Sequence, residues 1–305
     1  MNLVCRVPGL RPKCFYIAAF FTAILTAQAQ TIYVANQNSV LAFAPDGTAS
    51  TFATGFDNPI GLAFDNNGSL FVSNFANDSI SKVAPDGTVS TFATGVSTPA
   101  GLAFDSSGNL FVANSAANTV SEITQCGTVS IFASGFAYPT GLVFDASGNL
   151  FIGNANNGAT NNGTISRITS SGTVSTFVTG LLNPSSQLAF DSSGNLFVGS
   201  TGDGNIYRFT PDGLESVFAA GQGNPVGMAF DQNDNLYLTD QSVTIQEIAS
   251  NGASTTFASN GTLRTAQFIA IPSTVVPEPS VYALVLGLGA LGYVALLRKP
   301  TSNQC

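Results

Sequence analysis

Histidine is absent from the whole chain of 305 residues. Its absence excludes histidine-based general acid–base catalysis, histidine metal ligation and any Ser-His-Asp triad. Charged residues are also scarce, at 9% of the chain, whereas hydrophobic residues make up 44%. Together with abundant Gly, Ser, Thr and Asn, this composition is typical of a turn-rich, all-β exported protein with a sizeable core.

Basic residues are few in the segment 31–275. It contains four of them (Lys82, Arg167, Arg208 and Arg264) against sixteen acidic residues, which gives a net charge of −12. Such a surface repels a polyanion, so we expect no nucleic-acid partner.

Cysteines are also few. Cys5 and Cys14 lie near the N-terminus, Cys305 ends the chain, and Cys126 alone falls among the repeats, where other repeats have the Asp of a Pro-Asp-Gly turn. No disulfide can form within the repeat region. We expect Cys126 to be an unpaired turn residue; a reactive or pairing thiol is the alternative.

A repeated stretch organises the chain. GLAFDSSGNLFVAN at Gly101–Asn114 returns closely at 61–74 and 141–154 and more weakly at 187–200 and 227–240. Measured on the aromatic residue of its second half, six units follow one another at a spacing near 40 residues: Tyr33, Phe71, Phe111, Phe151, Phe197 and Tyr237. This period, with several short strands in each unit, indicates propeller blades, or a β-solenoid as the alternative.

Each unit contains four strand candidates joined by hairpin turns. In the unit of Phe111 they are Gly101–Phe104, Asn109–Ala113, Thr119–Ile123 and Thr128–Ala133. Asp-x-x-Gly turns join the first two strands and Pro-Asp-Gly turns join the last two. The sequence therefore predicts antiparallel four-stranded units.

The two ends of the array are out of phase in a complementary way. The first unit begins at Ile32–Ala35, already at its second strand, and the array ends with Gln267–Ile271, which aligns with a first strand. We therefore predict an all-β, six-bladed propeller at 30–275, closed by a C-terminal strand that completes the first blade.

The N-terminus has the pattern of a secretory signal peptide. Basic residues precede an apolar run at Cys14–Leu25, and the small residues Ala27 and Ala29 follow. We expect a signal peptide at 1–29, removed by signal peptidase after Ala29.

The C-terminus predicts an export signal of a different kind. Pro277, Glu278 and Pro279 precede an apolar run at 281–297, and Arg298 and Lys299 follow it. We expect a transmembrane helix at 281–297 and a cytoplasmic tail at 300–305, with the propeller on the periplasmic side. The segment 276–299 resembles the PEP-CTERM sorting signal of Gram-negative bacteria, which implies an exosortase-type sorting protease as partner and display at the cell surface or in the matrix; a plain membrane anchor is the alternative.

The repeat pattern Pro-x-Gly-Leu-Ala-Phe-Asp…Gly-Asn-Leu-Phe-Val-Ala-Asn resembles NHL-repeat propellers. It is also similar to the sugar-lactonase and streptogramin-lyase group. The lactonase resemblance implies a metal at the propeller axis, with some ligands just before the first-strand Gly. The residues there are Ile60, Ala100, Thr140, Ser186 and Val226, none of which is a carboxylate or amide. A divalent metal such as calcium is therefore unsupported, and we expect no cofactor and no catalytic set.

A ring of polar residues follows the second strand of the units. Its members are Asn36, Asn74, Asn114, Asn154, Ser200 and Asp240. They are candidates for binding a glycan or a cation, with turn capping by their side chains as the alternative. Tyr138 lies in a loop on the same face and could stack on a sugar; loop packing is its alternative role. An insertion at 155–163 extends this face and is expected to be a plain loop.

Two classes of function fit these observations. The first is an exported, non-catalytic propeller that binds polysaccharide or protein. The second is a metal-dependent, lactonase-like hydrolase on the same fold.

Overall fold

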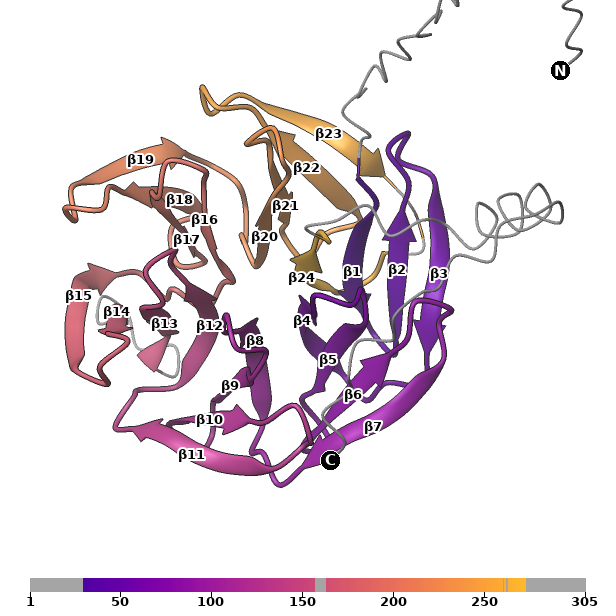
Figure 1. The fold of residues 1–305 in the computed structure, drawn as a ribbon. Coiled ribbons are helices and arrows are strands. Elements are labelled where there is room, and N and C mark those ends of the chain that lie inside the picture. The colour runs from indigo at the N-terminus through magenta and orange to yellow at the C-terminus, as the bar shows by residue number, and fades with distance from the viewer. Residues whose placement is uncertain (1–29, 157–162, 260, 262, 273–305) are drawn as a thin grey trace, which may run out of the picture.

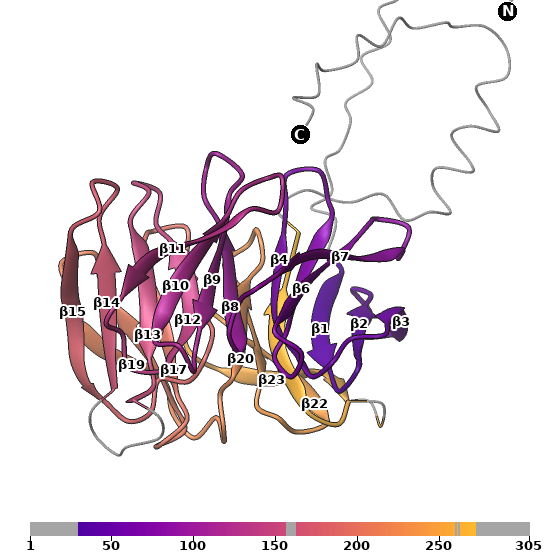
Figure 2. The same cartoon turned by 90° about the horizontal axis from the view of Figure 1, so that it is seen from below.

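The computed structural model describes residues 30–156, 163–259, 261 and 263–272, and these form a six-bladed β-propeller (Figure 1). Each blade is one four-stranded antiparallel sheet. The blades stand around a central axis with their strands running between the two faces of the ring (Figure 2). The predicted fold is therefore confirmed. Among the described residues, no helix is long and apolar enough to cross a membrane.

The blades are given from the innermost strand outwards. Blade 1 consists of β24 (Ala266–Ala270), β1 (Ile32–Asn36), β2 (Ser39–Phe43) and β3 (Ala49–Thr54). Blade 2 consists of β4 (Pro59–Phe64), β5 (Leu70–Asn74), β6 (Ser79–Val83) and β7 (Val89–Thr94). Blade 3 consists of β8 (Pro99–Phe104), β9 (Leu110–Asn114), β10 (Thr119–Ile123) and β11 (Val129–Ser134).

Blade 4 consists of β12 (Pro139–Phe144), β13 (Leu150–Asn154), β14 (Gly163–Ile168) and β15 (Val174–Leu181). Blade 5 consists of β16 (Leu188–Phe190), β17 (Leu196–Ser200), β18 (Asn205–Phe209) and β19 (Glu215–Ala219). Blade 6 consists of β20 (Gly227–Phe230), β21 (Leu236–Thr239), β22 (Thr244–Ile248) and β23 (Ser254–Ser259).

The ring closes through its two ends. Strand β24 pairs with β1, with Tyr33 opposite Ala270 and Val34 opposite Ile269, and the two lie side by side at the centre of Figure 1. The side chain of Gln30 also donates a hydrogen bond to the carbonyl oxygen of Pro272 (2.8 Å). The predicted closing strand is confirmed one residue earlier than expected, and no inner strand of the ring is left unpaired.

The core consists of six interfaces between neighbouring blades. Each contains an aromatic residue of a second strand, packed edge-to-face between a ring of the same blade's outer strand and, at five of the six interfaces, a ring of the next blade's inner strand. At the interface of blades 2 and 3, Phe71 lies 4.8 Å from Phe92 and 5.0 Å from Phe104 between ring centroids. The aromatic residue on which the repeat period was measured is thus the residue that joins one blade to the next.

The turns explain the regular hairpins. In the first hairpin of blade 3, Asp105 accepts hydrogen bonds from the backbone N–H groups of Ser107 (2.9 Å) and Asn109 (2.8 Å), and Gly108 has a φ of +83°. The Asp side chain satisfies local donors while Gly takes the left-handed conformation without steric cost.

Candidate functional site

Around the axis, where the lactonase resemblance implied a metal, neighbouring inner strands approach each other closely. A Cβ atom on Gly61 would lie 2.1 Å from the carbonyl oxygen of Ala100 in the next inner strand. On Gly101 it would lie 2.3 Å from the carbonyl oxygen of Thr140. At these two positions the neighbouring inner strands approach each other so closely that only glycine fits.

Gln187 replaces this glycine in blade 5, directly before β16. Its side chain accepts hydrogen bonds from the N–H groups of Ile269 (3.0 Å) and Met228 (3.2 Å) and donates one to the carbonyl oxygen of Ile269 (2.8 Å). One amide therefore bridges the inner strands of blades 5, 6 and 1. Sequence reasoning missed this residue, although QLAF in place of GLAF marked it.

The oxygen atoms near the axis do not fit a metal. The hydroxyl of Ser186 donates to the carbonyl of Gly199 (2.9 Å), and that of Thr140 lies 3.3 Å from the carbonyls of both Gly153 and Pro184. The side-chain oxygen of Gln187 already accepts two N–H groups. A hard cation needs several free oxygen ligands, and these are engaged with the chain itself. No group of three or more His, Cys, Asp or Glu side chains within the described ranges is placed to hold a metal.

Five members of the polar ring are buried in the blades, and Asp240 is partly buried. Asn74 accepts a hydrogen bond from the N–H of Asp57 (3.2 Å) and donates to the hydroxyls of Ser79 (3.0 Å) and Ser81 (2.9 Å). Asn114 makes the equivalent three hydrogen bonds, with the N–H of Ser97 and the hydroxyls of Thr119 and Ser121. Asn36 accepts hydrogen bonds from the N–H groups of residues 264 and 265. Ser200 donates to the carbonyl of Leu182, and Asp240 accepts from the N–H of Ser242. These bonds support the capping alternative, because each ties a second strand to a neighbouring loop or strand.

Asn154 departs from this arrangement. It donates to Thr164 (3.0 Å) and Ser166 (2.9 Å), but its side-chain oxygen is buried and has no partner among the described residues. A buried acceptor without a donor costs about 1–3 kcal/mol, so an added donor here would stabilise the protein. Asn154 lies opposite Pro139 in the register of blade 4, beside Tyr138.

Tyr138 lines a cavity of about 430 Å³ on this loop face. The other lining residues are Ser115, Ala116, Asn118, Phe136, Ala137 and Asn156. The described lining of the cavity thus combines two aromatic rings with amide and hydroxyl groups and contains no Lys, Arg, Asp or Glu. Of the sequence-predicted candidates, Tyr138 lines this cavity. Asn154 is not among the lining residues, and the other ring members lie in other blades.

The backbone at Tyr138 is in the left-handed region, with a φ of +54°. Three other blade junctions use the same conformation at the residue before proline, at Asn58, Thr98 and Asn183. Asn adopts it readily, whereas for a bulky residue it costs roughly 1–2 kcal/mol. Tyr138 is therefore not the residue that the backbone favours.

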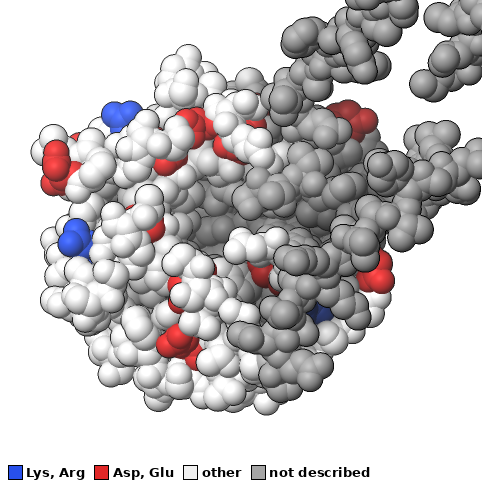
Figure 3. Space-filling model, in the orientation of Figure 1, with Lys and Arg blue, Asp and Glu red and all other residues white. Residues whose placement is uncertain are grey.

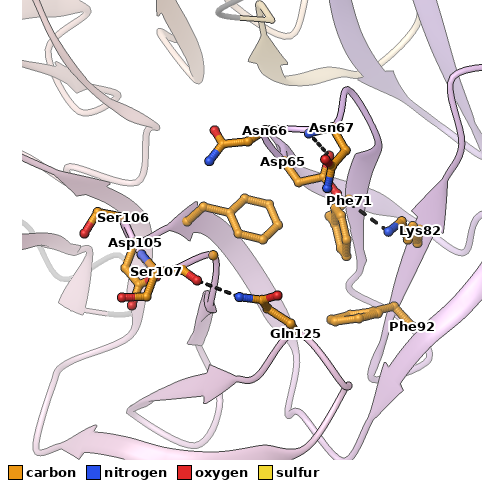
Figure 4. A pocket seen from close by; sticks show the side chains of 12 residues that line it. Asp65, Asn66, Asn67, Phe71, Lys82, Phe92, Asp105, Ser106, Ser107 and Gln125 are labelled. Atoms are coloured by element: carbon orange, nitrogen blue, oxygen red, sulfur yellow. Dashed lines mark hydrogen bonds and ion pairs between the residues drawn. The ribbon is translucent and has the colours of Figure 1, made fainter. Parts of the chain in front are cut away.

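The opposite face carries the Asp-x-x-Gly turns, with grooves between blades. One of about 260 Å³ lies between blades 2 and 3, where Lys82 is placed beside Phe71 and the amide of Gln125 donates to the carbonyl of Ser107 (2.7 Å) (Figure 4). A larger one of about 540 Å³ lies between blades 3 and 4. In Figure 3, acidic side chains are spread around the ring rather than gathered in one patch.

Two tyrosines have shifted pKa values. Burial, with the charges of Glu247 and Asp231, raises the pKa of Tyr237 to about 12. A hydrogen bond to Asp203 (2.6 Å) raises the pKa of Tyr207. Burial tends to raise the pKa of Asp203 itself, but hydrogen bonds led by that from Tyr207 outweigh it, and the net shift is downward.

Cys126 corrects one expectation. It is disulfide-bonded, so the prediction of an unpaired turn residue was wrong and the alternative of a pairing thiol holds. The other three cysteines lie outside the described residues. The same is true of the signal peptide with Ala27 and Ala29, of positions 157–162 of the insertion, and of the whole C-terminal signal with Pro277, Glu278, Pro279, Arg298 and Lys299.

The fold of this chain is shared with known proteins. A chain of a nidogen/laminin complex aligns with a TM-score of 0.73 at 21% identity, covering 80% of this chain and 99% of that one. A gluconolactonase from Xanthomonas campestris aligns with a TM-score of 0.64 at 16% identity, covering 79% and 91%. Virginiamycin B lyase from Staphylococcus aureus aligns with a TM-score of 0.55 at 20% identity, covering 66% and 69%. At these identities the likeness shows a shared fold alone.

No curated protein matches the sequence. A histidine-to-alanine variant of the staphylococcal lyase, whose structure includes quinupristin, is described as catalytically inactive. The model of the virginiamycin B lyase family matches residues 18–247. This match spans well over half of the sequence, and the chain therefore belongs to the virginiamycin B lyase family.

Proposed function

We propose that this protein is a non-catalytic binding module that holds a neutral glycan in the cavity lined by Tyr138. The observation that carries the proposal is the lining of this cavity, where Tyr138, held in a left-handed backbone conformation, lies with Phe136 and the amides of Asn118 and Asn156. The aromatic rings offer apolar surface to a sugar face, and the amides of Asn118 and Asn156 offer donors and acceptors.

The charge of the cavity favours a neutral ligand. Its lining has no Lys or Arg to pair with an acidic polysaccharide and no Asp or Glu to pair with a cation. Affinity and orientation would then come from hydrogen bonds and aromatic contact, as expected for an uncharged polyhydroxy compound.

Two further observations, on histidine and on the groups near the axis, support the proposal that the protein is not a catalyst. The chain has no histidine, whereas the staphylococcal lyase variant that lost one histidine is described as inactive. The side-chain oxygens near the axis, on Ser186, Thr140 and Gln187, are hydrogen-bonded to the chain itself. These observations favour a binding role over a histidine-dependent elimination or a metal-dependent lactone hydrolysis.

The proposed setting is the cell surface or extracellular matrix of a Gram-negative bacterium. It is supported by the sequence patterns of the two terminal segments. Signal peptidase and an exosortase-type protease would be the processing partners, and the C-terminal helix would anchor the chain in the inner membrane before sorting.

A glycan microarray tests the proposal with the purified protein and the Tyr138→Asn variant. We expect the native protein to bind neutral glycans and the variant to lose at least ten-fold in signal. Binding to none of the glycans, or equal binding by both proteins, contradicts the proposal.

The second candidate is catalysis of the lyase or lactonase type, which family membership and the gluconolactonase fold favour. Turnover assays with a type B streptogramin and with simple lactones, each with and without calcium or zinc, test it. Turnover above the uncatalysed rate would establish this candidate and contradict the non-catalytic proposal.

A further inference from the structure

One position on the third strand of every blade lies opposite, in register, the aromatic residue of the second strand. In blade 2, Lys82 lies opposite Phe71 in register, and in blade 3, Glu122 lies opposite Phe111. Around the ring this position is occupied by Ala42, Lys82, Glu122, Arg167, Arg208 and Glu247. The aromatic residue of the second strand is thus repeated in every blade, whereas the charge of the residue opposite it varies.

In the groove between blades 2 and 3, here the Lys82 groove, the chain supplies its own cation. The ammonium group of Lys82 lies 5.1 Å from the centroid of the Phe71 ring and 3.6 Å from a carboxylate oxygen of Asp65 (Figure 4). A ring face and a carboxylate together bind an ammonium group through its charge. The Lys82 groove therefore shows that an aromatic ring beside a carboxylate accommodates an ammonium group.

The groove between blades 3 and 4, here the Glu122 groove, repeats this site one unit later without the lysine. Phe111 and Asp105 stand where Phe71 and Asp65 stand, and Glu122 replaces Lys82. The cavity is about 540 Å³, against about 260 Å³ in the Lys82 groove. Within the described part of the chain, the Glu122 carboxylate makes no hydrogen bond or ion pair.

The lining of the Glu122 groove is acidic and aromatic. Its carboxylates come from Asp105, Glu122 and Asp145, and no Lys or Arg lines it. Its rings include Phe111, Phe144 and Phe132, which is 39% exposed and so accessible from solvent. An anion would be repelled here, whereas an alkylammonium group would find both partners that Lys82 has in the neighbouring groove.

We propose that the Glu122 groove binds the side chain of a lysine from a partner protein, held by cation–π contact and by the carboxylates of Glu122 and Asp105. The site lies on the face opposite the Tyr138 cavity and uses none of its residues. It therefore goes beyond the proposed glycan binding, and either can fail without the other.

The test is a titration of the purified protein with Nα-acetyl-lysine N-methylamide, followed by ligand-detected NMR. Nα-acetyl-norleucine N-methylamide has a similar apolar chain without the charge and serves as the reference. We expect millimolar binding of the lysine probe and at least ten-fold weaker binding of the norleucine probe. Equal binding of the two probes, or none, overturns the proposal.

Substitutions then locate the site. Glu122→Lys should fill the groove as Lys82 fills its neighbour and abolish binding, and Glu122→Gln, which keeps the shape, should weaken binding several-fold. Lys82→Glu should open a second site and double the number of probe molecules bound. Glu215→Lys makes the same charge change on exposed β19 and should leave binding intact. If Glu122→Lys still binds, or if Glu215→Lys loses binding equally, the site is not this groove.

Discussion

The side-chain amide of Gln187 is hydrogen-bonded to both the N–H and the carbonyl group of Ile269, 82 residues further along the chain. Ile269 belongs to the strand that closes the ring, and Met228, the third partner of Gln187, belongs to the blade between them. The amide thus connects the closing strand to two other blades at the axis, at the level where related blades use glycine.

Replacing this amide tests its structural role. Gln187→Leu leaves the N–H groups of Ile269 and Met228 without an acceptor, which should lower the free energy of unfolding by about 2–3 kcal/mol. Urea denaturation measures the change. Gln125→Leu, which removes one exposed amide bond, should change stability by no more than about 0.5 kcal/mol. Equal effects of the two substitutions would show that the axial bridge contributes nothing.

The close approach of inner strands gives a second prediction. Gly61→Ala places a Cβ 2.1 Å from the carbonyl oxygen of Ala100 and should destabilise the protein by about 3 kcal/mol. Gly55→Ala is the comparison, because its φ of +92° strains alanine while no atom lies within 4 Å, and it should cost about 1–2 kcal/mol. The midpoints of thermal unfolding of the two variants compare the cost of the clash at Gly61 with the cost of the left-handed strain at Gly55. A Gly61→Ala protein as stable as the native one would contradict the close approach of these inner strands.

Tyr138→Asn should stabilise the protein while impairing binding. It restores the residue found at Asn58 and Asn183, relieving the left-handed strain at Tyr138 by about 1 kcal/mol. Thr98→Asn relieves the same strain at a different blade junction and should leave glycan binding unchanged. Chemical denaturation gives the stabilities; a destabilised Tyr138→Asn protein would mean that Tyr138 serves packing.

Alkaline stability depends on Tyr237. Its pKa is raised to about 12 in the folded protein, so above pH 10 the unfolded chain releases this proton before the folded one does. Its stabilising contribution is therefore fully present below pH 10 and is lost as the pH rises from 10 to 12. In unfolding curves across this range, Tyr237→Phe should lose less stability than the native protein; parallel losses would show that Tyr237 does not titrate in this way.

The sequence predicted the architecture because each determinant is local and repeated. The period of the second-strand aromatics, the Asp-x-x-Gly and Pro-Asp-Gly turns and the out-of-phase ends together required a closed ring of six blades, and the pairing of β24 with β1 confirms it. The family resemblance likewise agrees with the virginiamycin B lyase match.

The sites depended on relationships that cross between blades. Asn74 and Asn154 occupy the same repeat position, yet only the structure shows that the oxygen of Asn154 lacks the donor that Asn74 has. The correspondence of Lys82 and Glu122 became informative only once the register placed each opposite a ring. Cys126 was misjudged because its bonding depends on the three-dimensional fold rather than on its turn.

The central claim is that the Tyr138 cavity binds a neutral glycan without turning it over. The most direct measurement is the dissociation constant of the strongest array glycan for the native, Tyr138→Asn and Thr98→Asn proteins, determined by calorimetry. The account predicts that Tyr138→Asn weakens binding at least ten-fold while Thr98→Asn matches the native protein, with the glycan recovered unchanged. Equal affinity of all three proteins, or conversion of the glycan, would contradict it.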